Sequence, residues 1–425
     1  MRAETGKCSL DRVSDWSLGD DQKVQYPRES EPHGESKASS IYEPYGGVLV
    51  NRVLPPQEAE EKIREAKEMT KIRPFTDFVY DAEKIAIGAY SPLDGFMDSS
   101  SFESVVGGNR LPNGLPWTIP IILAVQDDEV KEQKIREGQQ VALLDWDSRP
   151  FAILDVSEIF RYSKDNFAKG AYGTTDTSHP NVYDIYNNYG NTALAGKVKL
   201  IRRLELPTVK YELSPNETRE LFKSKGWKNV VAYQCRNPPH TAHEYIQKVS
   251  LENSEIDGLL IHPVIGRLKK GDYKPAVIMD AYKAVVAGYY PKDKVVLSSL
   301  SITMRYGGPK AALFYAIVRK NYGATHYIVG RDQAGVGKFY EPYACHRIFD
   351  EYDVGTIPLR YVETFYCRIC KSMATERTCP HPSEDHLAIS QTRMRELLKE
   401  GKELPSEILR LEVIKVLSQG DVILE

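Results

Sequence analysis

The sequence has no long hydrophobic run and little excess charge of either sign. No stretch approaches the roughly 20 apolar residues that a membrane-spanning helix needs, and the first residues contain no apolar segment of the kind found in secretory signals. We therefore expect a cytoplasmic protein that does not contact membranes. The formal net charge is −3, so no overall positive field attracts nucleic acid. If the substrates are anions, the positive charge that binds them must be concentrated locally.

Two familiar enzyme motifs are also missing. The chain has no GxxxxGK[ST] phosphate-binding loop, which argues against a fused P-loop kinase domain. His240 and His243 are three residues apart, whereas the zinc-protease helix needs histidines four apart with a glutamate beside the first. A zinc protease is therefore disfavoured.

Cysteine is scarce, with six residues in 425, yet Cys367, Cys370 and Cys379 lie close together. In a long cytosolic chain such a cluster indicates a metal site more than disulfides. With a histidine, these are the ligands of a tetrahedral structural Zn²⁺ site, which has no open position for substrate. Free thiols on a loop are the alternative. Spacing does not decide between His381 and His386, and we favour His386 because His381 follows Cys379 very closely.

The chain is long enough for two or three domains. Residues 1–40 are polar, and we expect a weakly ordered extension there. Residues 41–210 alternate short apolar runs with turn residues, which predicts a mainly β domain interrupted by one helix near 56–70. From residue 211 to about 365, strand-like runs alternate with helix-like runs, which predicts a parallel, Rossmann-like sheet.

The strand-like runs of this second region are each followed by a polar segment. The expected strands are 229–233, 258–265, 294–300 and 325–330. The expected helices are 240–252, 274–288 and 309–322. Ligands of open parallel sheets bind beyond the carboxyl ends of the strands, so we expect the polar segments to converge on one crevice.

The segment QCRNPPHTAH, from Gln234 to His243, follows one of these strands and opens a helix. Asn237 is placed to cap that helix, and the prolines suit a first helical turn. A helix N-terminus presents free N–H groups and a positive dipole end, both of which favour phosphate. Arg236 adds a planar set of donors for an oxyanion. The segment therefore predicts an anion site.

His240 and His243 are neighbours on the surface of the expected helix. Helical geometry puts His240 opposite the apolar stripe and His243 at its edge. The stripe comprises Ala242, Tyr245, Ile246 and Val249. A pair of packed or solvated histidines is the alternative, but the position at a strand–turn–helix junction favours phosphate binding.

Three further segments carry candidate anion ligands. The glycine-rich GRDQAGVG (330–337) lets backbone approach a nucleotide closely. In MRYGGP (304–309), Arg305 is either an anion ligand or a surface charge. In ISQTRMR (389–395), Ser390 is placed to cap a helix, and the hydroxyls, including that of Thr392, together with Arg395 either hold phosphate or serve capping alone.

Several passages in this order resemble the ATP sulfurylase (sulfate adenylyltransferase) family, from about residue 44 to the C-terminus. They are YGGVLVNRV (45–53), IGAYSPLDGFM (87–97), RLPNGLPWTIPI (110–121), YGTTDTSHP (172–180), QCRNPPHTAHE (234–244), MRYGGPKAALFYAIVRKNYG (304–323), GRDQAGVG (330–337) and ISQTRMRELL (389–398). The resemblance implies a PUA-like β domain, a Rossmann-like catalytic domain and a small C-terminal domain over 366–425. It also implies that ATP and sulfate react reversibly to adenosine 5′-phosphosulfate and pyrophosphate with Mg²⁺, in a homodimer or larger homo-oligomer.

The resemblance also implies roles for single residues. Gln234 and Arg236 correspond to sulfate ligands, and the backbone of Ala334 to a further sulfate contact. Arg236 and Asn237 correspond to part of the nucleotide phosphate site, and His240 and His243 to the pair that steadies the phosphates. The nucleotide-binding loop corresponds to Gly330, Arg331, Asp332 and Gln333.

The sequence departs from the family at a few positions. Cys235 stands where many members have threonine, and we keep it among the catalytic candidates with Arg236, Asn237, His240 and His243. Gln333 replaces a histidine that is common in the family but retains an amide donor. Two other functions remain open on the residues alone. One is an adenylyltransferase for another anionic acceptor, such as a mononucleotide or phosphopantetheine, and the other is an RNA-binding protein with PUA-like and zinc modules.

Overall fold

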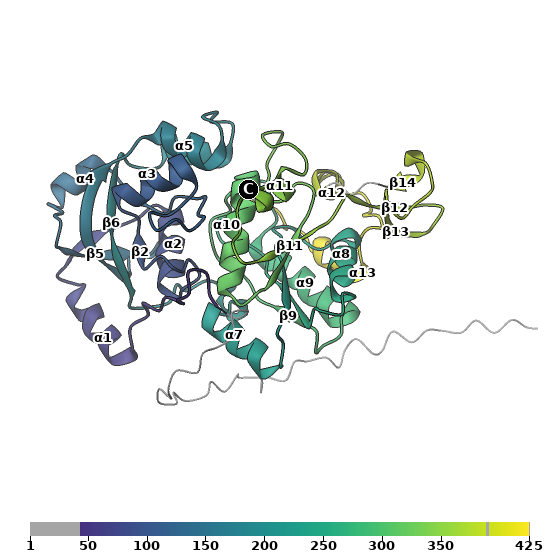
Figure 1. The fold of residues 1–425 in the computed structure, drawn as a ribbon, viewed down its shortest axis with the longest axis horizontal. Coiled ribbons are helices and arrows are strands. Elements are labelled where there is room, and N and C mark those ends of the chain that lie inside the picture. The colour runs from purple at the N-terminus through teal and green to yellow at the C-terminus, as the bar shows by residue number, and fades with distance from the viewer. Residues whose placement is uncertain (1–42, 388–390, 425) are drawn as a thin grey trace, which may run out of the picture. The chain divides into compact units, whose positions relative to one another are not determined.

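A computed structural model of the chain describes residues 43–387 and 391–424, without the side chains of Gln391 and Thr392 (Figure 1). The expected extension over 1–40 and the expected helix cap at Ser390 lie outside these residues. Over the described ranges, no helix combines the length and apolar character needed to cross a membrane.

The N-terminal region is built around a six-stranded sheet. Its strands are β1 (Thr70–Ile72), β2 (Gly95–Phe96), β3 (Leu123–Val125), β4 (Gln140–Leu144), β5 (Pro150–Arg161) and β6 (Thr192–Leu200). They follow the order β1-β4-β5-β6-β2, and β3 also pairs with β6. Three of them, β3, β4 and β5, overlap the apolar runs at 119–125, 141–147 and 151–156 that predicted strands.

This region contains more helix than the sequence predicted. Its helices are α1 (Pro56–Glu65), α2 (Thr76–Ala86), α3 (Ser99–Gly108), α4 (Asp127–Glu132), α5 (Lys164–Tyr172) and α6 (Pro180–Asn187). Helix α1 confirms the helix expected near 56–70, but the expectation that it was the single helix of this region was wrong. The physical reason is clearest in α2, where every residue from Asp77 to Ala86 is buried. Its charged residues Asp77, Asp81, Glu83 and Lys84 are buried with partners from other segments, so polarity in the sequence does not mark which side of this segment faces the core.

The second region has a five-stranded, fully parallel sheet, as predicted. Its strands are β7 (Val230–Tyr233), β8 (Gly258–Ile261), β9 (Val295–Leu297), β10 (His326–Val329) and β11 (Ile357–Arg360). Its helices are α7 (Pro215–Ser224), α8 (Thr241–Leu251), α9 (Pro275–Tyr289), α10 (Gly308–Asn321) and α11 (Ala344–Glu351), and the 3-10 turn η2 (Val209–Tyr211) precedes them. These elements confirm the Rossmann-like alternation.

The strand order β11-β10-β7-β8-β9 places a topological switch between β7 and β10. The chain leaves β7 toward β8 on one side and returns to place β10 on the other. Ligands of open parallel sheets bind beyond the strand ends at such a switch. The segments that follow β7 and β10 are QCRNPPHTAH and GRDQAGVG, so the topology brings the two strongest sequence candidates to one place.

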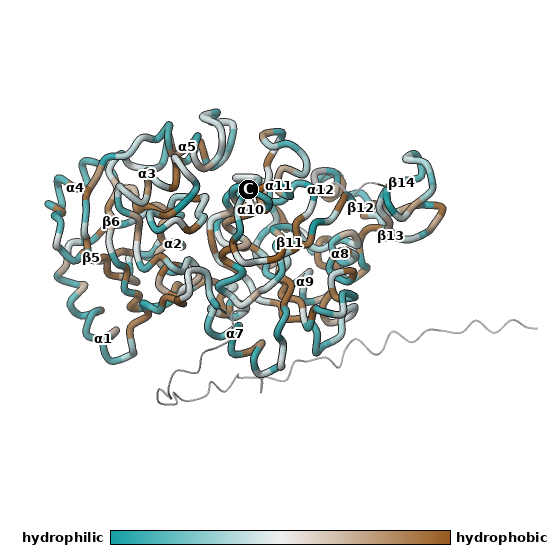
Figure 2. Tube along the Cα trace, in the orientation of Figure 1, coloured by the Kyte–Doolittle hydropathy of each residue, from teal (hydrophilic) through white to brown (hydrophobic). Residues whose placement is uncertain are grey.

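Helix α10 joins the two sheets into one hydrophobic core. Its Phe314 contacts Tyr90 and Trp117 of the N-terminal region, at ring-centroid distances of 5.3 and 5.6 Å. One buried cluster contains apolar residues from both regions, and the described residues form one compact unit. Figure 2 shows hydrophobic segments along α9 and the strands, whereas the outer helices α1 and α4 are largely hydrophilic.

The C-terminal part consists of a small antiparallel sheet and two helices. The sheet has β12 (Thr364–Cys367) between β13 (Ser372–Thr375) and β14 (His386–Leu387), with the turn η3 (Ser383–Asp385) before β14. The helices are α12 (Gln391–Lys399) and α13 (Leu411–Leu417), and α13 packs against α9.

Candidate active site

A cavity of about 290 Å³ lies at the carboxyl ends of β7 and β10. Its lining includes His240 and His243 from one segment and Gly330, Arg331, Asp332 and Gln333 from the other. The structure therefore brings together six residues that the sequence placed in one nucleotide site, although about ninety residues separate the two groups along the chain.

The two histidines form a stacked pair at the start of α8. Their ring centroids are 3.5 Å apart, with an interplanar angle of 25°. His240, rather than Asn237, is the residue that caps the helix, because its Nδ1 accepts a hydrogen bond from the His243 backbone N–H at 3.4 Å. The predicted apolar stripe is correct at Ala242 and Ile246, which are buried, and wrong at Val249, which is exposed.

Burial keeps both imidazoles neutral. It lowers the pKa of His240 well below its ordinary value of 6.5, with a further contribution from His243, and it lowers the pKa of His243 to about 3. Because Nδ1 of neutral His240 accepts a hydrogen bond, its proton must be on Nε2. His240 is thus arranged as a hydrogen-bond donor rather than as a cation.

We expect the neutral state of His243 to make stability pH-dependent. The unfolded chain protonates this imidazole near pH 6.5 and the folded chain near pH 3, so its contribution is present above 6.5 and is lost as the pH falls. At pH 5.5 the loss is about 1.4 kcal/mol. Urea unfolding at pH 7.5 and 5.5 should show a smaller pH dependence for His243→Gln than for the unsubstituted protein. Equal pH dependence in the two proteins would show that burial does not hold His243 neutral.

A hydrogen-bond chain links the two segments behind the cavity. The hydroxyl of Tyr327, in β10, donates to Gln234 Oε1 at 2.9 Å and accepts from Gln333 Nε2 at 3.0 Å. Cys345, in α11, donates its thiol hydrogen to the carbonyl oxygen of Gln333 at 3.0 Å. Gln234 is thereby fixed in orientation, and Gln333 is fixed through both its side chain and its backbone.

Arg236 lies beside the same strand ends. Its guanidinium sits over the ring of Tyr306, 4.9 Å from the centroid, and its Nη2 donates to the carbonyl oxygen of Gly335 at 3.3 Å. Its Nη1 is 3.7 Å from the carboxylate of Asp272. These contacts leave several of the five guanidinium N–H groups free of protein partners, as an anion ligand requires.

Asn237 and Arg395 meet at this place although they are far apart in sequence. Arg395 Nη2 donates to Asn237 Oδ1 at 2.7 Å and to Asp272 Oδ1 at 3.3 Å. Arg395 comes from α12, so the C-terminal part contributes to the site, as the sequence predicted for this residue. The Thr392 side chain lies outside the described part of the chain, and its expected role stays a prediction.

The loop after β10 holds Ala334 in an unusual conformation. Ala334 has φ of +56°, and its carbonyl oxygen accepts a hydrogen bond from Gly308 N–H at 3.1 Å. Gly308 itself has φ of +51°, and a Cβ there would meet the ring of Tyr340 at 2.4 Å. Only glycine allows this approach, which secures the loop against the start of α10.

The same loop is attached to the N-terminal region. The hydroxyl of Tyr340 donates to the carbonyl oxygen of Tyr172 at 3.1 Å and lies 3.2 Å from His179 Nε2. The ring of Phe339 packs edge-on against His179, at a centroid distance of 5.0 Å. Both His179 and Tyr172 are buried. The first sheet region therefore supports the segment that lines the cavity.

Two residues that the sequence suggested for the site have contacts that support the fold instead. Arg305 is buried, and its Nη2 donates to Asp81 of α2 at 2.6 Å, so its guanidinium joins the two regions and we remove it from the nucleotide site. The thiol of Cys235 is buried in an apolar cluster, and that burial raises its pKa to about 12. A thiol held in the protonated form is a poor participant, so the catalytic assignment of Cys235 is also corrected.

Sequence reasoning missed two residues of the site, Asp272 and Tyr327. Asp272 belongs to the polar segment after β8, which was expected to reach the crevice without any one residue being singled out. Tyr327 lies inside a strand-like apolar run. A tyrosine in such a run is expected to pack in the core, and nothing in the sequence indicates that its hydroxyl makes a hydrogen bond in the site.

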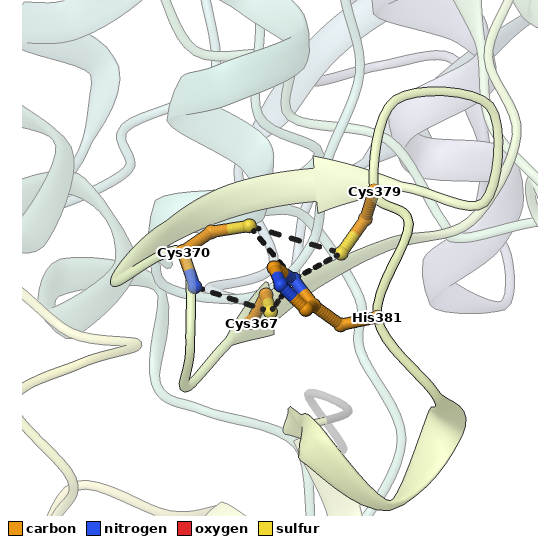
Figure 3. Close-up of side chains that lie close together, drawn as sticks. All are labelled: Cys367, Cys370, Cys379 and His381. Carbon is orange, nitrogen blue, oxygen red and sulfur yellow. Dashed lines mark hydrogen bonds between the residues drawn. The ribbon is translucent and has the colours of Figure 1, made fainter.

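A separate cluster of four side chains lies on the small C-terminal sheet (Figure 3). Among the described residues, Cys367, Cys370, Cys379 and His381 are the group suited to a metal ion, with ligand atoms within 4.8 Å of one another. The distances from His381 Nδ1 to the three sulfurs are 3.4, 3.2 and 3.6 Å, and Cys370 and Cys379 Sγ are 3.9 Å apart. Tetrahedral Zn²⁺ requires S···N edges of about 3.5 Å and S···S edges of about 3.8 Å, so the side chains fit.

The choice of His386 as fourth ligand was wrong. Its ring stacks on Phe365, with centroids 3.6 Å apart and an interplanar angle of 15°, so it belongs to the packing of β12 and β14. The imidazole of His381 points toward the three thiols despite its short spacing from Cys379 (Figure 3).

The comparisons with known proteins agree with this geometry. A family model described as ATP-sulfurylase matches residues 209–420, and one described as PUA-like domain matches residues 42–203. The sulfate adenylyltransferase of Pyrococcus abyssi is 43% identical over 382 residues, covering 90% of this chain and 98% of the relative. That of Symbiobacterium thermophilum is 45% identical over 380 residues, covering 89% and 95%.

Solved structures share the fold. The hexameric APS kinase from Thiobacillus denitrificans superposes with a TM-score of 0.71 at 24% identity, covering 89% of this chain and 68% of that chain. The likeness extends over both sheet regions described above, and at this identity it concerns the fold alone.

Proposed function

The chain belongs to the ATP-sulfurylase family and is a nucleotidyltransferase that transfers the adenylyl group of ATP to sulfate, and from this premise we propose which residues carry the reaction. The observation that supports the assignment is the cavity at the ends of β7 and β10, which His240, His243 and the loop from Gly330 to Gln333 line together. An oxygen of sulfate attacks the α-phosphorus, the bond from that phosphorus to the β-phosphate oxygen breaks, and pyrophosphate leaves. Because sulfate is already ionised, no general base is needed.

Arg236, Gln234 and the backbone N–H of Ala334 are the proposed sulfate ligands. Gln234 is fixed by Tyr327, so its amide nitrogen remains available as an oriented donor. Ala334 is held at positive φ by Gly308. Fixed donors need no reorganisation when charge develops, which is how such groups lower a barrier. The chain's task is therefore to hold sulfate in line with the bond that breaks.

His240, His243, Asn237 and Arg395 are the proposed phosphate ligands, together with the loop from Gly330 to Gln333. The neutral imidazole of His240 donates from Nε2, so it binds phosphate oxygen without adding a charge that burial would oppose. The negative charge of ATP is balanced instead by the arginines and by Mg²⁺. In the described part of the chain, no cluster of carboxylates forms a Mg²⁺ cage, so we propose that Mg²⁺ enters bound to the phosphates of ATP, where it neutralises charge.

We further propose that the cluster of Cys367, Cys370, Cys379 and His381 holds a structural Zn²⁺. All four positions of a tetrahedron are filled by protein atoms, so none is open for substrate. A cytoplasmic location and a homodimeric or larger assembly remain part of the proposal. They rest on the sequence and on the family relationship.

The decisive experiment measures pyrophosphate released from ATP with and without sulfate. We expect release that depends on sulfate, and continuous ATP cleavage when molybdate replaces it, because molybdate has the shape and charge of sulfate. Release without either oxyanion would contradict the assigned acceptor site. An acceptor such as a mononucleotide should not support release, which separates this function from other adenylyl transfers.

A further inference from the structure

Asp272 is a fully buried carboxylate surrounded by cationic side chains. Lys269 Nζ donates to its Oδ1 at 2.9 Å, Arg395 Nη2 donates to the same oxygen at 3.3 Å, and Arg236 Nη1 is 3.7 Å away. The hydroxyl of Tyr306 donates to the other oxygen, Oδ2, at 2.9 Å. The carboxylate side chain has 0% exposure, whereas the three cations are each partly exposed. The cations therefore lie between a buried anion and the solvent side of the site.

We infer that Asp272 is a positioning residue that assembles Arg236, Lys269 and Arg395 into one oxyanion-binding group, with Lys269 as a third cation toward sulfate. The inference rests on the proposed function of Arg236 as a sulfate ligand. It extends that function to two residues, Asp272 and Lys269, neither of which was among the site residues predicted from the sequence.

Charge balance explains why a carboxylate is needed. Three cations and one carboxylate leave a surplus of two positive charges, which matches the two negative charges of sulfate. Without the carboxylate, three like charges would lie within a few ångströms of one another in a partly buried place, where their repulsion is weakly screened. They would separate, and the donors that face the oxyanion would lose their common geometry.

The surrounding rings support the same arrangement. The guanidinium of Arg236 lies over Tyr306 and that of Arg395 over Tyr273, with distances of 4.9 and 5.3 Å to the centroids. Each arginine is thus held by an aromatic face on one side and by Asp272 at its end. The three cations come from separate places in the chain, before α8, before α9 and within α12, so only the shared carboxylate connects all three.

The first test compares Asp272→Asn with Asp145→Asn. Asp145 is a buried carboxylate that pairs with Arg202 at 2.8 Å and Arg149 at 3.3 Å in the N-terminal region, away from the cavity. We expect both variants to lower the melting temperature, but only Asp272→Asn to raise the KM for sulfate, by about tenfold to a hundredfold. A sulfate KM within twofold of the unsubstituted protein in Asp272→Asn would overturn the inference.

A second test covers the case in which Asp272→Asn does not fold. Lys269→Met removes one cation of the group, and Lys274→Met removes a similarly exposed lysine that pairs with Asp421. Only Lys269→Met should raise the sulfate KM, by about tenfold, with no change in melting temperature beyond that of Lys274→Met. Equal sulfate KM values in the two variants would overturn the role of Lys269.

These outcomes are separable from a failure of the proposed function. If the unsubstituted protein releases no pyrophosphate in response to sulfate, the function fails before any variant is measured. Suppose that the unsubstituted protein does respond to sulfate. If Asp272→Asn then lowers kcat/KM by the same factor with Arg236 as with Ala at that position, Asp272 acts on the fold rather than through Arg236. A positioning role requires the effect of Asp272→Asn on kcat/KM to shrink at least threefold in the Arg236→Ala background, because the two changes then remove the same interaction.

Discussion

Replacement of Arg236 by alanine should lower kcat/KM for sulfate by about a hundredfold or more. A preorganised donor that faces developing charge contributes roughly 3–4 kcal/mol to the transition state, which corresponds to that loss. Arg236 is suited to the role because Tyr306 and Gly335 fix its guanidinium and leave further N–H groups free. Initial rates of pyrophosphate release at varied sulfate would measure the effect.

A matched control for this variant is Arg202→Ala. Arg202 has a similar exposure and is also paired with a buried aspartate, since its Nη2 donates to Asp145 at 2.8 Å, but it lies in the N-terminal region. It should lose stability without a hundredfold loss of rate. Near-normal turnover in Arg236→Ala, or an equal loss in Arg202→Ala, would contradict the assignment of Arg236 to sulfate.

Loss of the metal cluster should have the second large effect. We expect one Zn²⁺ per chain, and His381→Ala should abolish its binding, because three ligands with an open position hold structural Zn²⁺ poorly. His386→Ala is the matched control, since this ring stacks on Phe365 and does not reach the thiols. Metal analysis of the two purified variants distinguishes them, and loss of zinc only in His386→Ala would contradict the structure.

The consequence for folding should be local and severe. The cluster ties the hairpin of β12 and β13 to the segment that reaches His381, and the cluster of buried residues on this small sheet contains only Phe365, Cys367 and Ala374. Small metal-bound elements of this kind draw much of their folding free energy from the metal, on the order of 10 kcal/mol in isolated peptides. Chelation should therefore expose residues 364–387 to proteolysis. Persistence of an uncleaved segment after complete zinc removal would show that the sheet is stable by itself.

The sequence predicted the parallel sheet well because strand-like apolar runs alternate with helix-like runs along the chain. It predicted the convergence of QCRNPPHTAH and GRDQAGVG for a topological reason, since parallel strands present their carboxyl ends at one edge. The N-terminal helices other than α1 were missed. In α2 the charged residues Asp77, Asp81, Glu83 and Lys84 are buried with partners from other segments, and only the tertiary fold supplies those partners.

Site residues could be predicted where the residue type alone indicates the chemistry. They could not be predicted where the surrounding residues determine the role of a side chain. His240, His243 and Arg236 were identified from type and position. Arg305 and Cys235 have equally suggestive types, but burial against Asp81 and within an apolar cluster gives them other roles. No pattern in the sequence reveals such partners.

The choice between His381 and His386 depended on the path of the chain, which spacing does not contain. Only Pro380 lies between Cys379 and His381, and so short a separation favoured His386 as the fourth ligand. In the structure the ligand atoms of Cys379 and His381 nevertheless lie close enough to bind one metal ion. Asp272 could not be predicted from the sequence either, because its proposed role depends on three cationic side chains, two of which belong to distant segments of the chain.

The attachment of Tyr340 to Tyr172 and His179 has a consequence for how this protein is inherited. The loop that continues from the cavity lining packs against residues 168 and 161 positions earlier in the chain, in the N-terminal region, so the two regions are not interchangeable. Recombination near residue 205 would join the parallel-sheet region of this protein to the N-terminal region of another protein, which need not provide the same contacts to Tyr340. Compensating changes at positions 172, 179 and 340 would then have to arise together. Selection on reaction rate should therefore reach substitutions far from any substrate atom.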